Sequence, residues 1–74
     1  MDARWLANQS FFNGADSEEI QLSAKVSVSF ALSVLNDGYN DLDSLMTKAI
    51  EVKTIGELKQ IIANAENIIK NRAE

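Results

Sequence analysis

The 74-residue sequence predicts a small all-α domain: three helices preceded by an aromatic N-terminal segment. Three observations predict this class. Helix start and stop signals bound the apolar segments, the last of these segments repeats its apolar residues at helical spacing, and no long strand-like segment has a partner of matching length. The length fits one domain over residues 1–74.

The first dozen residues hold much of the aromatic content. Asp2 is a candidate N-cap for a helix that ends near Asn13 and Gly14. Trp5 and Phe12 admit two roles. They can close the core, or they can anchor a partner, because aromatic side chains dominate interface hot spots.

Residues 17–36 are predicted as the first long helix. Asp16 and Glu19 have the spacing of a capping box, and Gly38 supplies a stop signal after Asn36. The same segment also satisfies a strand template over residues 20–34, because apolar side chains occupy every second position: Ile20, Leu22, Ala24, Val26, Val28, Phe30, Leu32 and Val34.

A strand over residues 20–34 is therefore the alternative, and it implies an α+β fold in which this long strand pairs across a dimer. Fifteen residues far exceed the usual strand length, and the only other strand-like piece, residues 49–53, is too short to cover it. The helix is the favoured interpretation, and its inward stripe is then Ile20, Ala24, Val28, Ala31 and Leu35.

Two further helices follow, over residues 41–51 and 55–72. Asn40 is the expected N-cap of the first, and Thr54 with Glu57 forms a capping box for the second. The second helix has a coiled-coil-type seam of barely two heptads: Ile55, Leu58, Ile62, Ala65 and Ile69.

A chain of this size buries a small core, and disulfides or a metal site often supplement such a core. The sequence contains neither cysteine nor histidine, which leaves self-association as the remaining supplement. We therefore expect a homodimer with the seam of the last helix as its interface.

The composition also argues against catalysis. Without histidine or cysteine the chain lacks the usual general base, thiol nucleophiles and most transition-metal ligands. Ser44 and Lys48 are four residues apart, a spacing that is far more typical of a solvated helix surface than of an activated serine. We expect no enzyme activity, no cofactor and no metal site.

The charge pattern carries the functional hypothesis. The net charge is −4, and no Lys or Arg occurs between Lys25 and Lys48. Direct nucleic-acid binding needs the opposite sign, so we expect none. The candidate partner-binding residues combine two acidic groups with aromatic anchors: Asp37, Asp41, Asp43, Asp16, Glu18, Glu19, Tyr39, Trp5 and Phe12.

These residues suggest an acidic inhibitor that occludes a basic nucleic-acid-binding surface of another protein, in the manner of a DNA mimic. In size and acidity the chain is similar to small inhibitors that bacteriophages make against host enzymes, although no motif carries a family resemblance. The alternative is a structural or regulatory helical homodimer or adaptor that acts through the isoleucine-rich last helix. No signal peptide or membrane span is recognisable, so we expect a cytoplasmic protein without membrane contact.

Overall fold

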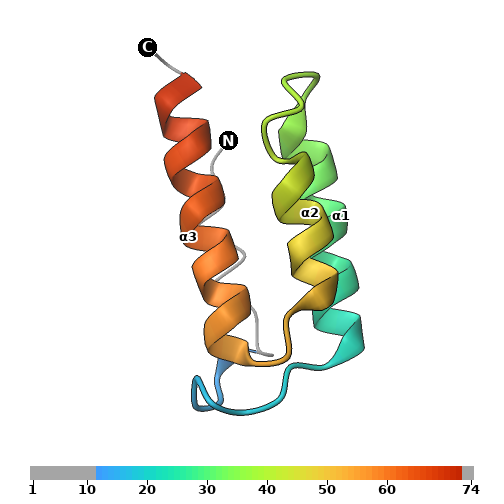
Figure 1. The fold of residues 1–74 in the computed structure, drawn as a ribbon, viewed down its shortest axis with the longest axis vertical. Helices are drawn as coiled ribbons and strands as arrows, with labels where there is room; N and C mark the ends of the chain where they lie inside the picture. Colours follow the sequence, from blue (N-terminus) through green and yellow to red (C-terminus); the bar gives the residue numbers. More distant parts are fainter. Residues whose placement is uncertain (1–11, 73–74) are drawn as a thin grey trace.

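The computed structural model describes residues 12–72, which form three α-helices. They are α1 (Leu22–Asn36), α2 (Asp43–Glu51) and α3 (Ile55–Arg72). The helices run up, down and up, so that α1 and α2 form an antiparallel pair with α3 alongside it (Figure 1). The all-α prediction is confirmed for these residues, and the alternative strand over residues 20–34 is wrong. Most of the predicted aromatic segment lies outside the described residues.

The start of α1 differs from the prediction. The helix begins at Leu22, after an extended Gln21 that makes no side-chain cap, rather than at residue 17. The capping box expected from Asp16 and Glu19 is therefore wrong. The capping signal does not determine the start of the helix, because backbone groups of residues 16–20 form hydrogen bonds with a segment that is far away in the sequence.

That distant segment is the start of α3. The Ile20 N–H donates to the Lys53 carbonyl at 2.9 Å, and the Glu18 carbonyl accepts from the Ile55 N–H at 2.9 Å. These two bonds flank a single antiparallel bridge between residues 19 and 54. A third bond runs from the Gly56 N–H to the Asp16 carbonyl at 2.9 Å. The pairing ties the chain before α1 to the first turn of α3.

Gly56 is required by this close approach. A Cβ atom at this position would lie 2.9 Å from the Asp16 Cβ and 3.1 Å from the Asp16 carbonyl oxygen. Any side chain would therefore push the two segments apart. Gly56 therefore has a packing role, which the sequence alone did not indicate.

The core lies between the three helices. The inward stripe predicted for the first helix is buried, as are four of the five seam residues of the last helix. The fully buried large side chains are Leu32, Leu42, Leu58, Ile62 and Val28. Leu45 and Ala49 of α2 are buried as well, so the core draws on every helix and on the loop before α2.

Asn36 joins the end of α1 to the start of α2. Asn36 is only 8% exposed, although it is a polar residue at the end of a helix. The side-chain Oδ1 accepts from the Leu42 N–H at 3.1 Å, and Nδ2 donates to the Asp43 carboxylate at 2.7 Å. Asn36 thus supplies the polar contacts at the first turn of α2 from outside that helix.

The predicted cap of α2 is wrong. Asn40 has a positive φ of 61° and lies in the loop, and α2 begins at Asp43 rather than at residue 41. The stop of α1 is confirmed, with Asp37 and Gly38 both at positive φ after Asn36. These left-handed residues turn the chain so that Asn36 faces the start of the next helix.

The bounds of α3 agree with the prediction of residues 55–72. The Thr54 hydroxyl accepts from the Glu57 N–H at 3.3 Å and donates to the Glu57 carboxylate at 3.0 Å. The capping box of this helix is therefore confirmed on its Thr54 side.

We predict that Asn36→Ala lowers the free energy of unfolding by about 1–3 kcal/mol, because it leaves the buried Leu42 N–H without its acceptor. Urea denaturation followed by circular dichroism measures the change. Asn67→Ala is the matched control, since Asn67 is exposed in the middle of α3 and should be neutral or slightly stabilising. Equal losses for the two variants would contradict the role given to Asn36.

Candidate interaction surfaces

The six candidate carboxylates do not form one surface. Asp37, Asp41 and Asp43 lie at the end of the bundle where α1 passes into α2, whereas residues 16–19 lie at the opposite end (Figure 1). The expectation that the two groups could join on one face is therefore wrong. The two acidic groups are apart because the full length of α1 lies between them.

Arg72 pairs with one of the three carboxylates of the first group, Asp41. From the last turn of α3 its guanidinium forms two hydrogen bonds with Asp41, through Nε to Oδ2 at 2.8 Å and through Nη2 to Oδ1. It also donates to the carbonyl oxygens of Leu35 at 2.7 Å and Asn36 at 3.2 Å. These carbonyls belong to the last turn of α1, where cations are favoured by the helix dipole.

We call this arrangement the Arg72 clasp; it comprises Arg72, Asp41, Tyr39 and the last carbonyls of α1. The guanidinium carbon lies 4.3 Å from the centre of the Tyr39 ring, which covers its face. The hydrogen bonds from Arg72, assisted by its charge, hold the pKa of Asp41 below its ordinary value of 3.8 against a smaller opposing effect of desolvation. The same pair raises the pKa of Arg72.

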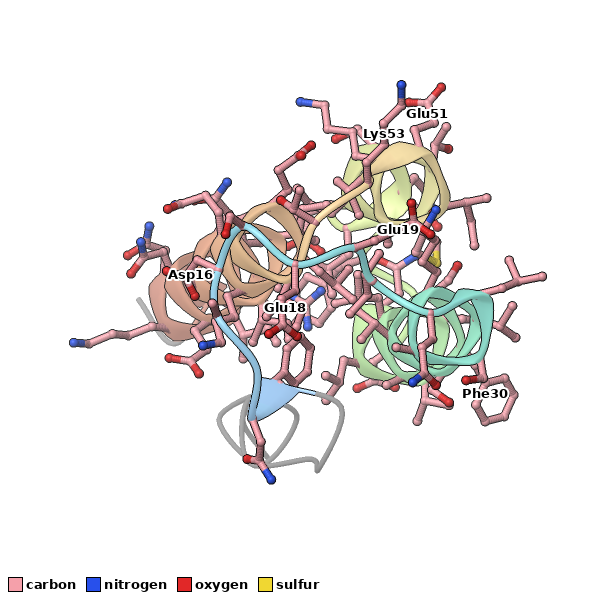
Figure 2. All side chains as sticks on the ribbon, turned by 90° about the horizontal axis from the view of Figure 1, so that it is seen from below. Asp16, Glu18, Glu19, Phe30, Glu51 and Lys53 are labelled. Carbon is pink, nitrogen blue, oxygen red and sulfur yellow. The ribbon has the colours of Figure 1, made fainter. Side chains whose placement is uncertain are left out.

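The other carboxylates differ in how far they are engaged. Asp43 accepts the hydrogen bond from Asn36, and Asp16 pairs with Lys59 at 3.2 Å. The side chains of Glu18 and Glu19 are exposed and make no hydrogen bond or ion pair within residues 12–72. Glu51 and Lys53 lie at the same end of the molecule as Glu18 and Glu19, so acidic and basic side chains are mixed there (Figure 2).

The aromatic residues proposed as anchors for a partner lie in different environments. Phe12 is buried in the core, so it is not accessible as an anchor for a partner, and that expectation is wrong. Tyr39 is exposed but already stacks on Arg72. Trp5 lies outside the described residues. The Arg72 clasp accounts for Tyr39 and Asp41 as parts of the fold.

The seam predicted as a dimer interface is used within one chain. Ile55, Leu58, Ile62 and Ala65 are buried against the other helices, and only Ile69 at the end of the seam is partly accessible. A second copy could reach these side chains only by displacing part of the same bundle. The proposed seam therefore offers no free surface in the folded monomer.

A different apolar surface is exposed on α1. Four side chains at intervals of four residues are more than half exposed, namely Leu22 at 69%, Val26 at 53%, Phe30 at 70% and Val34 at 56%. We call these four residues the α1 ridge. Phe30 points away from all three helices (Figure 2). Sequence analysis missed the ridge as a surface, although the alternating pattern of residues 20–34 contained its signal.

The ridge is bordered by small polar side chains. Ser23 and Ser27 are exposed along one side, and Ser33 is exposed on the other. The only charged residue of α1 is Lys25, which is half-buried at the edge toward α2. The exposed face of α1 therefore carries no carboxylate, and its one cation lies partly buried beside the ridge.

Other kinds of site receive no support from the described residues. Between residues 12 and 72, no group of three acidic, histidine or cysteine side chains is arranged to hold a metal ion. No helix in that range is long and apolar enough to cross a membrane. Comparison of the chain with protein-family models, curated proteins and solved structures finds no match.

We predict an acid-dependent contribution of the Arg72 clasp to stability. Because the folded state lowers the pKa of Asp41, the contribution is complete above the ordinary value of 3.8 and is lost as the pH falls through the lower folded value. The difference in unfolding free energy between the natural protein and Asp41→Asn should be constant near neutral pH and shrink below about pH 4.

Urea denaturation over a pH series measures this difference. Glu19→Gln is the control, since this exposed carboxylate has no cation partner within residues 12–72 and its replacement should change stability little at any pH. A difference for Asp41→Asn that stays unchanged down to pH 2 would contradict the role given to the ion pair.

Proposed function

We propose that the protein is a non-catalytic protein-interaction module that contacts other polypeptides through the α1 ridge. The observation that carries this proposal is the exposure of four large apolar side chains in one continuous row. Isolated exposed apolar residues are common, but a contiguous apolar surface rimmed by polar residues is typical of a protein-binding site.

The size of the chain strengthens the argument. A small domain has few apolar side chains with which to build a core, and burial of each large one contributes about 1.5–3 kcal/mol. Leu22 and Phe30 are nevertheless outside the core and contribute little of this to folding. A partner that covers the ridge would gain that contribution without any rearrangement of the core.

An adaptor role through the last helix has less support, because its seam is already packed inside the chain. The interaction surface of the proposed module is therefore on α1 rather than on α3. The Arg72 clasp and the pairing at the start of α3 hold α3 against the other helices, which keeps the opposite face of α1 free.

A basic surface on a partner protein is the second candidate target. It is favoured by the exposed Glu18 and Glu19, which have no cation partner within residues 12–72, and by the net charge of −4. In this form of the proposal one end of the bundle occludes the basic surface. Complementary charge would then set the association rate and the choice of partner.

Site-specific photo-crosslinking tests the two surfaces in one experiment. A photoreactive phenylalanine analogue replaces Phe30 on the ridge, Glu19 at the acidic end, or Ala63 on the exposed face of α3 as the control. Each variant is expressed in its native host, illuminated and analysed by mass. We expect polypeptide adducts at position 30 and background levels at position 63.

The outcomes separate the proposals. Adducts at position 19 alone would replace the ridge by the acidic end and support the basic-surface candidate. Adducts at position 30 no more abundant than at position 63 would contradict the interaction through α1, whatever the result at position 19.

A further inference from the structure

The α1 ridge has the shape that two identical helices need in order to pack together. Its four side chains follow the i, i+4 row of the helix and span about 18 Å at 1.5 Å per residue. Such rows form the ridges by which helices interdigitate, most often at a crossing angle of about −50°. The ridge is therefore a complete contact surface for one helix of similar length.

One of the two rows beside the ridge is low. It holds Ser23 and Ser27, which are both exposed, whereas the row on the other side holds Lys25, Ser29 and Ser33. Because serine side chains are short, the first row forms a groove next to the taller ridge. The ridge of one α1 can lie in the groove of another, so the face is complementary to itself, as a two-fold interface requires.

The charge distribution is compatible with the same occupant. Two copies of a chain with a net charge of −4 repel one another, and a two-fold interface brings identical residues together. The four ridge side chains are uncharged, and the only charged residue of α1 is the partly buried Lys25, which fits the depletion of charged residues in interface cores. A strongly basic partner would find no carboxylate on this face.

We propose that a second copy of this chain covers the α1 ridge, forming a two-fold symmetric dimer in which α1 packs against α1. The inference rests on the proposed interaction through α1 and names its partner. One such helix pair buries on the order of 800 Å² in total, which is less than stable interfaces bury and is in the range of weak, transient ones. We therefore expect a weak dimer that dissociates between about micromolar and millimolar concentration.

Sedimentation equilibrium of the full chain from micromolar to millimolar concentration tests the proposal. The average mass should rise from 8.2 kDa toward twice that value. The double variant Val26→Ser with Phe30→Ser should raise the dissociation constant at least about tenfold. Ala63→Ser is the control, because it introduces a serine on the exposed face of α3, away from the ridge, and should leave the dissociation constant unchanged. Circular dichroism verifies that each variant retains its helices.

A cysteine on the ridge provides a second readout, since the natural chain has no thiol. Val26→Cys should form a disulfide-linked dimer on oxidation at least about tenfold faster than Ala63→Cys at the same concentration. This comparison reports contact between the two α1 faces and does not depend on loss of a fold.

Each result has a definite meaning. A strict monomer at millimolar concentration would overturn the dimer. A dimer that is unaffected by the serine variant would overturn the interface. Crosslinks from position 30 to a different protein, together with a monomer in sedimentation, would overturn the second copy as partner while supporting the proposed interaction module.

Discussion

Apolar side chains at every second position cannot all face one side of a helix, because each residue turns the chain by about 100°. Residues 20–34 have such a pattern and nevertheless fold as α1 for most of their length. Half of the alternating residues therefore enter the core, including Ala24, Val28 and Leu32. The other half become the α1 ridge. The core and the candidate interaction surface both follow from this one constraint.

The rest of the structure keeps that division in place. At one end, backbone hydrogen bonds pair residues 16–20 with the start of α3. At the other end, the Arg72 clasp holds the last turn of α3 against the end of α1. Between the two attachments the three helices share one core. With α3 fixed on the inner side, the outer face of α1 remains accessible.

Local patterns in the sequence predicted the features that depend on neighbouring residues. The bounds and capping box of α3 and the inward stripe of α1 are of this kind, because helical spacing and a Thr-x-x-Glu signal act within a few residues. The stop after Asn36 was also predictable from Gly38. Each of these signals was strong because it coincided with the apolar periodicity.

The features that were missed depend on residues far apart in the chain. Asp16 and Glu19 have the spacing of a helix start, but bonds to residues 53–56 determine their conformation. Asp41 was interpreted as a free charge, since nothing in its neighbourhood indicates Arg72, which is 31 positions away. Burial of Asn36 likewise depends on how the loop returns to α2. The ridge is the exception, because its spacing of four was present in the sequence, but its residues lay outside the predicted inward stripe and were not interpreted as a surface.

The central claim is that α1 buries one half of its alternating apolar residues and exposes the other half. Val26 and Val28 test it directly, since they are the same residue two positions apart and are 53% and 0% exposed. Urea denaturation of Val26→Ala and Val28→Ala, at a concentration low enough to keep the chain monomeric, gives the two costs. Val28→Ala should lower the free energy of unfolding by about 2 kcal/mol, and Val26→Ala by less than about 0.5 kcal/mol. Equal costs would place both side chains on one buried face, as in a strand, and would contradict the account.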